Sequence, residues 1–468
     1  MAGLFALKTH QDTPETYVIL HPTRIILRPR KDRPRSLSQD KDPTVPLSSL
    51  ISLALRPIHR GHTAFASFAA LAVLLLAPSS ATRAAELACR MAAEPSPVGT
   101  VHVARPTIGW GIWPSTPGTR VTSVVLTLNG ARVPARYVAA ERAVAYEPDT
   151  ALAPGAYEAR CRVTFNETWP VDKTWRFTVA AAARVQLAAP DERQAKAFAL
   201  ANRFRRALGL PDFVLDDRLC ASALAHARYL ENARGFGHAQ QASLPGFIGT
   251  GPSERNAAFG FSGGCYENVS SGVPTVAGSV GGLFDAPYHR IPFLQPGAPA
   301  FGAGFAGDNC ALEFGMTTAG AGNAAIVVSP AHGQTNVPLS WDGVETPSPL
   351  RLHGDAASGG PVGYVITFAC FASGDEGGSA RLRVSSATLS VEDTGAAVPF
   401  LLNTPGNDDH LSNAAFLIPT RPLRPGTTYR VCVRAQTVSG GDASRSWTFT
   451  TTTSSGDDEA TLRLAAAR

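Results

Sequence analysis

The 468-residue sequence has little charge and lacks several motifs that would assign it to a large functional class. Charged residues make up 17% of the chain, against about 25% in an average protein, while 44% are hydrophobic, so the composition is that of a globular protein. There is no H-E-x-x-H, no P-loop and no C-x-x-C pair, and basic residues do not alternate with aromatic ones. These absences exclude the common zinc-protease, phosphate-loop and zinc-ribbon classes, and we expect no nucleic-acid partner.

The sequence also lacks an apolar run long enough to span a membrane. Residues 64–77 (AFASFAALAVLLLA) are uncharged, but as a helix they cover about 21 Å, less than the roughly 30 Å of a bilayer core. Arg56 and Arg60 precede this run, and Ser79 and Ala81 place small residues where a signal peptidase cleaves. We predict an extension plus signal peptide over residues 1–81, with a buried helix or an uncut signal anchor as alternatives. The mature chain would then have no transmembrane segment and would be secreted, periplasmic or on the cell surface.

The positive charge of the chain lies in this leader. Residues 28–35 (RPRKDRPR) predict no packed structure, so the segment is either a disordered tail or the result of a start assigned too far upstream. Up to Ala81 the chain has 10 Lys/Arg and 5 Asp/Glu, which leaves 32 of each sign in the remainder. The net charge of +5 therefore says nothing about the partners of the mature protein.

All seven cysteines follow the leader, and an exported chain permits disulfides. We predict three bridges, each within one module, and a free Cys220. The predicted pairs are Cys89–Cys161, Cys265–Cys310 and Cys370–Cys432.

Two distant segments repeat one pattern. LAPGAYEARCRV (152–163) is followed by WRFT (175–178), and LRPGTTYRVCVR (423–434) is followed by WTFT (447–450). Each pattern predicts a Pro-Gly turn, an alternating strand and a closing strand that begins with Trp.

Further alternating strands are predicted at 121–130 and 387–395. The abundance of turn residues, 43 Gly and 36 Pro, is consistent with many short strands. The two regions resemble bacterial immunoglobulin-like β-sandwiches over residues 89–182 and 327–452, and we expect a flexible tail at 453–468. Modules of this kind serve as spacers or adhesive surfaces.

Between these two regions the hydrophobic residues no longer alternate but recur at the spacing of a helix. Ala197, Leu200, Ala201, Phe204 and Leu208 lie on one face of a helix. Asp191 is its predicted N-cap, and a second helix begins at Asp216 or Asp217. Segments 300–316 and 324–329 predict strands, so residues 190–325 are expected to form an α+β domain.

Two glycine-rich segments in this region match known functional motifs, but neither is followed by the helix that its motif requires. Residues 260–264 (GFSGG) fit a nucleophile elbow, but a turn and a strand follow instead of a helix. Residues 302–307 (GAGFAG) fit a dinucleotide fingerprint, but no helix opens after them. We therefore expect neither an α/β-hydrolase nor a Rossmann site.

Five short motifs occur in a defined order in the central region. They are Ala223-Leu-Ala-His226-Ala, Phe236-Gly-His238, Glu267-Asn268, Pro287-Tyr288-His289-Arg290 and Gly302-Ala-Gly304. In this order they resemble the CAP superfamily of cysteine-rich secretory, antigen 5 and pathogenesis-related proteins, most of all its bacterial secreted branch. The resemblance implies an α/β/α sandwich over residues 190–325, between the two all-β modules.

The resemblance also implies a cavity. His238, His289 and Glu267 match three of the four residues that line it in the family, and Ala286 stands at the second acidic position. Two imidazoles and one carboxylate are a ligand set for Zn²⁺ or another divalent cation, but they can equally form a polar floor without metal. His226 is expected to be a packing residue. The cavity motif adds three ligand-binding candidates, Asn268, Tyr288 and Arg290.

Three hypotheses for function follow. The first is a non-catalytic binding module that takes a lipid, peptide or glycan in the cavity. The second is a divalent-metal hydrolase that uses His238, Glu267 and His289, although no nucleophile with a base is evident in the sequence. The third is a structural or adhesive surface protein in which the central domain is a scaffold.

Overall fold

The computed structural model describes most of the chain after the leader and two short segments within it. The described residues are 16–21, 24–29, 91–114, 118–139, 142–233, 235–261, 263–297, 299–315, 325–354, 361–371, 382–438 and 440–453. The predicted signal core (64–77), Cys89 and tail residues 454–468 lie outside them. No helix in the described part is long and apolar enough to cross a membrane.

The chain divides into two units, Met1–Ala77 and Pro78–Arg468. In the first, β1 (Thr16–His21) and β2 (Arg24–Pro29) pair antiparallel. This pair was not predicted, and its second strand includes Arg28 and Pro29, the first two residues of the segment 28–35.

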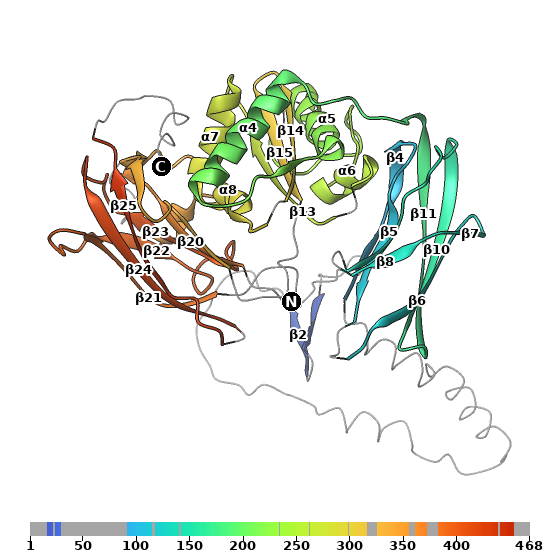
Figure 1. Cartoon of the computed structure of the whole chain (residues 1–468), viewed down its shortest axis with the longest axis horizontal. Helices are drawn as coiled ribbons and strands as arrows, with labels where there is room; N and C mark the ends of the chain where they lie inside the picture. The colour runs from blue at the N-terminus through green and yellow to red at the C-terminus, as the bar shows by residue number, and fades with distance from the viewer. Residues whose placement is uncertain are drawn as a thin grey trace, which may run out of the picture. The chain divides into compact units, whose positions relative to one another are not determined.

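The second unit begins with a β-sandwich, the N-terminal β module (Figure 1). One sheet has the order β4-β11-β10-β6-β7 and the other the order β3-β5-β9-β8. The repeated segment forms the antiparallel pair β10–β11, and the predicted strand at 121–130 is β6. The strands are β3 (Met91–Ser96), β4 (Gly99–Val103), β5 (Ile108–Trp113), β6 (Val121–Leu128), β7 (Ala131–Val133), β8 (Arg136–Val138), β9 (Ala143–Tyr146), β10 (Gly155–Phe165) and β11 (Trp169–Arg184).

The C-terminal β module is a second sandwich, with sheets β16-β20-β23-β22 and β17-β25-β24-β21 and the short pair β18-β19. Its repeated segment forms the antiparallel pair β24–β25. The elements are β16 (Ala325–Ser329), β17 (Gln334–Val337), β18 (Ser340–Trp341), η2 (Pro349–Leu352), β19 (Val362–Gly363), β20 (Ile366–Phe371), β21 (Leu382–Val391), β22 (Phe400–Asn403), β23 (Ala414–Pro419), β24 (Thr428–Thr437) and β25 (Arg445–Thr451).

The two β modules have further features in common at the repeated positions. Trp175 and Trp447 are buried, each in the core of its own module. The tyrosine of each repeat ties its hydroxyl to a nearby backbone group: Tyr157 donates to the carbonyl of Ala153 at 2.9 Å, and Tyr429 accepts from the amide of Arg424 at 2.8 Å. The prediction of two immunoglobulin-like sandwiches is confirmed.

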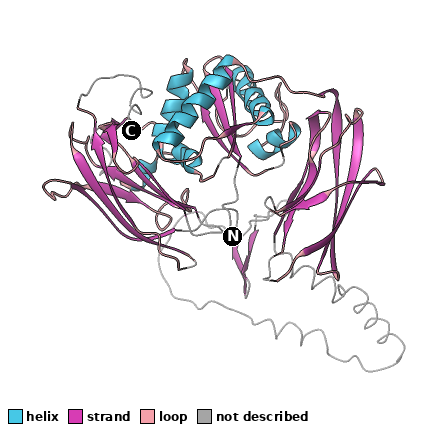
Figure 2. Cartoon of the chain, in the orientation of Figure 1, coloured by secondary structure: helices cyan, strands magenta, loops and turns pink. Residues whose placement is uncertain are grey.

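The central module carries most of the helices of the described chain (Figure 2). Its sheet has the order β12-β14-β15-β13. The elements are α4 (Glu192–Ala207), β12 (Val214–Leu215), α5 (Asp217–Ala233), α6 (Pro252–Ala258), β13 (Cys265–Ser270), α7 (Val276–Asp285), α8 (Pro287–Arg290), η1 (Ile291–Leu294), β14 (Ala300–Ala306) and β15 (Asn309–Gly315).

Both predicted helices form where the sequence placed them. Asp191 caps α4 in a capping box with Gln194, and α5 begins at Asp217. The predicted strand at 300–316 is the antiparallel pair β14–β15. The predicted strand at 324–329 is β16, which pairs with β20 of the C-terminal β module.

Helices cover both faces of the central sheet, because alternate residues of β14 face different helices. Phe301, Ala303 and Phe305 share a core with α4 and α7. Gly302 and Gly304 face α5, where an added Cβ would lie 2.2 Å from Leu219 C and 2.0 Å from Leu224 N. The Gly-x-Gly motif therefore serves close helix–strand packing, which produces the α/β/α sandwich.

The predicted disulfides within the described residues are wrong. Cys265 pairs in register with Gly315, and Cys310 with Ser270, so the two cysteines are about 17 Å apart along the strands. A disulfide requires Cα atoms within about 7 Å.

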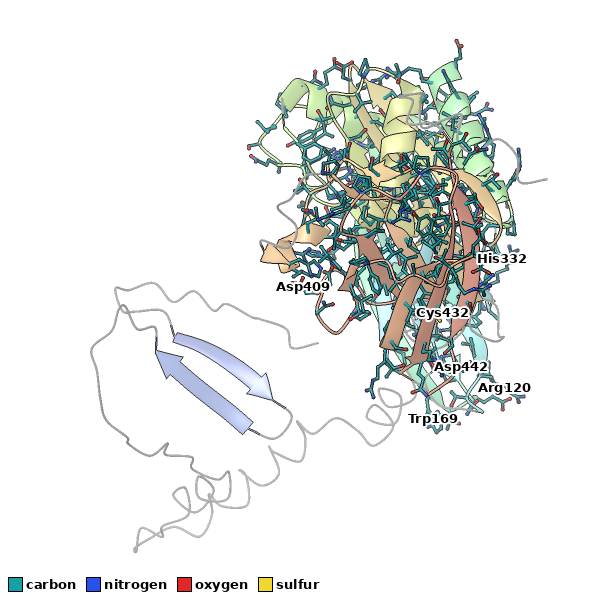
Figure 3. All side chains as sticks on the ribbon, turned by 90° about the vertical axis from the view of Figure 1, so that its left-hand side faces the viewer. Arg120, Trp169, His332, Asp409, Cys432 and Asp442 are labelled. Carbon is teal, nitrogen blue, oxygen red and sulfur yellow. The ribbon has the colours of Figure 1, made fainter. Side chains whose placement is uncertain are left out.

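Cys370 and Cys432 are separated by the sandwich itself. Cys370 faces the core, whereas Cys432 (Figure 3) lies on the opposite face of β24 and contacts Ser446 Oγ at 3.1 Å. Cys161 and Cys220 are buried free thiols, and the predicted partner of Cys161, Cys89, lies outside the described residues.

Candidate functional site

A cavity of about 260 Å³ lies between the central module and the C-terminal β module. The central module lines it with His238, Tyr266, Glu267, Asn268, Tyr288, His289, Ile291 and Pro292. The C-terminal β module adds Thr346, Pro347, His410, Ser412 and Asn413. Five of the six predicted cavity residues thus line one site, whose second wall the sequence did not predict.

Glu267 on β13 joins a buried arginine to a half-exposed histidine. Its Oε1 lies 2.9 Å from Nδ1 of His238, and its Oε2 accepts from Nη2 of Arg255 at 2.5 Å. Arg255 is fully buried on α6 and also donates to the carbonyl of His238 at 2.9 Å. Burial would raise the pKa of Glu267, but the His238 hydrogen bond and the Arg255 charge outweigh it and lower that pKa to about 2. Glu267 is therefore ionised and fully engaged at neutral pH.

His226 on α5 is buried behind this pair and does not line the cavity. Its Nε2 lies 3.0 Å from the carbonyl of Gly237, and its Nδ1 lies 3.1 Å from Gln240 Nε2. Burial lowers the pKa of His226 to about 4, so its ring is neutral at physiological pH. The contacts agree with the predicted packing role.

Glu313 on β15 is a further buried acid that the sequence analysis did not single out. It pairs in register with Glu267, and its Oε2 accepts from Asn256 Nδ2 at 3.0 Å. Burial and the nearby Glu267 charge raise the pKa of Glu313 well above its usual value. Glu313 is therefore the protonated member of this carboxyl pair, and Glu267 is the charged one.

His289 on α8 has its carboxylate partner in the C-terminal β module. Its Nδ1 lies 2.6 Å from Oε1 of Glu345, and its backbone amide donates to the same oxygen at 3.0 Å. The Glu345 side chain is fully buried. Ala286 stands at the acidic position of the family motif, so the carboxylate that bonds the His289 ring comes from outside its own domain. No sequence signal pointed to Glu345, which lies 56 residues away.

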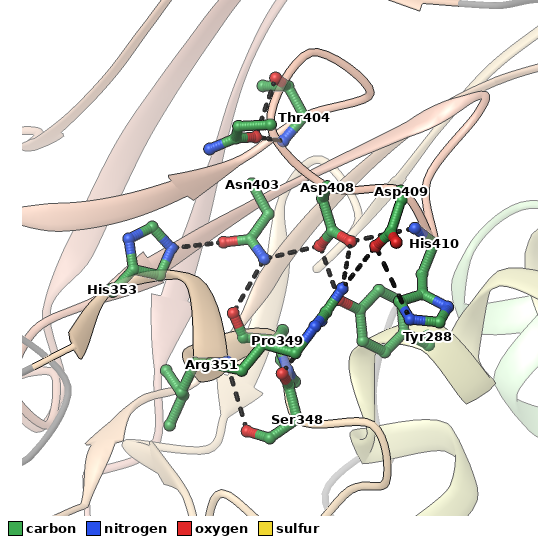
Figure 4. Close-up of polar contacts among 12 residues, drawn as sticks. Tyr288, Ser348, Pro349, Arg351, His353, Asn403, Thr404, Asp408, Asp409 and His410 are labelled. Carbon is green, nitrogen blue, oxygen red and sulfur yellow. Dashed lines mark hydrogen bonds and ion pairs between the residues drawn. The ribbon is translucent and has the colours of Figure 1, made fainter. Parts of the chain in front are cut away.

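Tyr288 makes a second polar connection across the joint, the contact between the central module and the C-terminal β module. Figure 4 shows this polar network. Its hydroxyl donates to Asp408 Oδ2 and accepts from Arg351 Nη1, both at 2.6 Å. Arg351 also bonds Asp408 at 3.0 Å and Asp409 at 2.9 Å. Burial and the Asp408 hydrogen bond raise the pKa of Tyr288, so its hydroxyl stays protonated. The network holds the ring of Tyr288 at the cavity, 5.6 Å from the ring of His410.

Of the two remaining ligand-binding candidates, Asn268 lines the cavity and Arg290 does not. Asn268 donates to the carbonyl of His289 at 2.7 Å. Arg290 was predicted to bind ligand, but it is fully buried away from the cavity. Its guanidinium donates to the carbonyls of Phe284, Asp285 and Val365 and to Thr367 Oγ1, as its four hydrogen bonds show. Arg290 therefore joins the two modules instead of contacting a ligand.

The residues present do not fit the predicted three-ligand metal site. No group of three or more His, Cys, Asp or Glu side chains in the described chain is arranged to hold a metal ion. Both oxygens of Glu267 are already engaged, one by Arg255 and one by His238. His289 is bound to a different carboxylate, that of Glu345. His238 with Glu267 and His289 with Glu345 thus form two separate His–carboxylate pairs.

The fold and site define a class: an α/β/α sandwich between immunoglobulin-like modules, with three histidines in a polar cavity. Residues 198–316 match the model of the cysteine-rich secretory protein family, CAP. The central module is therefore a CAP domain, and the predicted family resemblance is confirmed.

Solved structures resemble the chain only in part. A Bacillus anthracis str. Ames extracellular protein containing an SCP domain is 12% identical, over 46% of this chain and 67% of that one, with a TM-score of 0.24. CopC from Methylosinus trichosporium OB3b is 19% identical, over 19% of this chain and 92% of that one, with a TM-score of 0.16. SGBP-B of the mixed-linkage glucan utilization locus of Bacteroides ovatus is 10% identical, over 77% of this chain and 67% of that one, with a TM-score of 0.15. No curated protein matches the chain.

Proposed function

We propose that this CAP-domain chain is an exported, non-catalytic binding protein. Its ligand, a lipid, peptide or glycan, occupies the cavity between the CAP domain and the C-terminal β module. The N-terminal β module serves as a spacer or docking surface. The observation that carries this proposal is the engagement of the two cavity histidines of the CAP domain, His238 with Glu267 and His289 with Glu345.

This arrangement favours binding over catalysis. Neither aliphatic hydroxyl side chain in the described lining, Thr346 or Ser412, is hydrogen-bonded to an imidazole, so no serine or threonine nucleophile is paired with a base there. A metal-dependent reaction would require Glu267 to leave Arg255, which would strand a buried guanidinium. A mixed polar and aromatic cavity with fixed side chains is typical of a small-ligand site.

The experiment is a thermal-shift and calorimetry panel on the full chain. Its probes are palmitate, a neutral tripeptide and a neutral monosaccharide, with Zn²⁺ as a separate arm. We expect one organic probe to raise the melting temperature, because a ligand that binds only the folded state stabilises it. His289→Ala should abolish that shift. His332→Ala should retain it, because His332 is exposed and does not line the cavity (Figure 3).

Two results would overturn the proposal. One is that no organic probe binds and the thermal shifts are the same in the wild type and His289→Ala. The other is stoichiometric, high-affinity Zn²⁺ binding that His289→Ala removes, which would favour the hydrolase alternative.

A further inference from the structure

The size and walls of the cavity restrict the ligand class. Its volume of about 260 Å³ is below the roughly 300–1,000 Å³ of pockets that enclose drug-sized molecules. Only three lining residues have aliphatic side chains, Ile291, Pro292 and Pro347. An acyl chain would therefore bury polar lining groups without hydrogen-bond partners, which is costly. The cavity fits one small polar unit better than a lipid tail.

The charge at the cavity is already compensated. Glu267 is ion-paired with Arg255, and one oxygen of Glu345 accepts two hydrogen bonds from His289, so both carboxylates already have partners within the protein. No lysine or arginine lines the described cavity. A phosphate or carboxylate ligand would find no lysine or arginine there to offset its desolvation, so the lining favours a neutral ligand.

The lining offers both acceptors and a donor. Nδ1 of His238 and Nδ1 of His289 each bond a carboxylate, so in the neutral form of each ring the proton is on Nδ1 and Nε2 is an acceptor. Asn413 is 4% exposed and lines the cavity, and its Nδ2 has no hydrogen-bond partner among the described residues. A hydroxyl group both donates and accepts, so a polyhydroxylated ligand satisfies acceptors and donor together.

Aromatic rings complete the lining. Tyr266, Tyr288 and His410 all border the cavity, and the Tyr288 hydroxyl is held by Asp408 and Arg351. A sugar ring has an apolar face of C–H groups that packs on an aromatic ring, while its hydroxyls lie at the edge. Rings that the protein already orients lose little entropy when they bind.

From these four observations we infer that the cavity binds one neutral pyranose unit of a glycan, held jointly by the CAP domain and the C-terminal β module. The inference rests on the proposed function and narrows its ligand class. His410, Ser412 and Asn413 come from the C-terminal β module, so the sugar site is incomplete in the CAP domain alone.

The test is ligand-observed saturation-transfer NMR on the full chain. The probes are glucose, galactose and N-acetylglucosamine, with palmitate and a neutral tripeptide as separate arms. We expect saturation transfer to at least one sugar and to neither other probe. Asn413→Leu is nearly isosteric and removes the unpartnered donor. It should weaken sugar binding about tenfold or more, while the melting temperature stays unchanged or rises.

The matched control is Asn232→Leu, because Asn232 is exposed near the end of α5 and does not line the cavity. It should bind sugar as the wild type does. Equal sugar binding by Asn413→Leu and the wild type overturns the inference. Binding of palmitate or the peptide but no sugar also overturns it, while the proposed function stands. Binding of no organic probe overturns both.

Discussion

His289 and Glu345 form a hydrogen bond between two modules, with 2.6 Å between Nδ1 and Oε1. The same carboxylate oxygen accepts from the backbone amide of His289 at 3.0 Å. Glu345 thus orients the imidazole and stabilises the start of α8, which has no side-chain cap of its own. A residue outside the CAP domain sets the geometry of one of its two cavity histidines.

Removing this carboxylate should destabilise the joint. Glu345→Ala leaves a buried amide and the His289 ring nitrogen without their acceptor, so we expect the free energy of unfolding to fall by about 1–3 kcal/mol. Urea denaturation followed by tryptophan fluorescence measures the change. Glu147→Ala is the control, because Glu147 is exposed and its loss should cost less than about 0.5 kcal/mol. Equal effects of the two substitutions would contradict a role for Glu345.

Arg290 should be a larger contributor to the same joint. Its buried guanidinium donates to Phe284 O at 2.7 Å and Val365 O at 2.6 Å. Arg290→Met leaves these carbonyls unpaired and should lower the free energy of unfolding by about 3 kcal/mol or more. Arg424→Met, at an exposed position, should change it little. Chemical denaturation of both variants checks this, and a loss below about 1 kcal/mol for Arg290→Met would show that the joint does not depend on it.

Acid should destabilise the CAP domain in two steps. The pKa of His226 is about 4 in the folded protein and about 6.5 in the unfolded chain, so the unfolded chain binds more protons between these values. The free energy of unfolding should therefore fall by up to about 3 kcal/mol as the pH drops from 6.5 to 4. The pKa of Glu267 is also lower in the folded protein, at about 2, so its protonation likewise reduces the free energy of unfolding as the pH falls. This second loss occurs between about pH 4.3 and 2.

His226→Gln tests this assignment, because glutamine does not titrate. Urea denaturation at several pH values should show a flatter profile between pH 6.5 and 4 in the variant, with the lower step retained. Identical slopes in the wild type and His226→Gln would show that another group causes the loss.

The Gly-x-Gly strand should tolerate no side chain. In Gly304→Ala the new Cβ would lie 2.0 Å from Leu224 N, a backbone atom of α5, so we expect a loss of more than about 3 kcal/mol in stability. Gly282→Ala, in α7, meets nothing within 4 Å and should stabilise the protein by about 0.4–1 kcal/mol. Thermal melts of the two variants measure the contrast. Melting temperatures that shift in the same direction would refute the packing role of Gly304.

Local patterns in the sequence predicted much of the fold. The cap at Asp191, the period of α4 and the alternation of β6 depend on near neighbours, so a single sequence reveals them. The repeated Trp175 and Trp447 strands were recognisable for the same reason. The strand β16 was predicted, but the boundary drawn near residues 325–327 passes through it, because strand propensity does not say which sheet a strand joins.

The site was only half predictable. His238, Glu267 and His289 followed from family motifs, but Arg290 shares a motif with His289 and points elsewhere. The wall from the C-terminal β module depends on how two modules pack, and no local pattern encodes that. The two disulfide pairs within the described residues, Cys265–Cys310 and Cys370–Cys432, failed for a similar reason, since strand register and sheet face decide which thiols meet.

The most direct test of the central claim, that two modules share one ligand site, is NMR of the full chain with ¹³C-labelled histidine during a sugar titration. The chain has 11 histidines, of which His238, His289 and His410 line the cavity. We predict that these three signals shift with one common midpoint, while the signal of the exposed His332 stays fixed. Shifts of His238 and His289 without His410, or no shift in any of the three, would contradict a cavity shared between the CAP domain and the C-terminal β module.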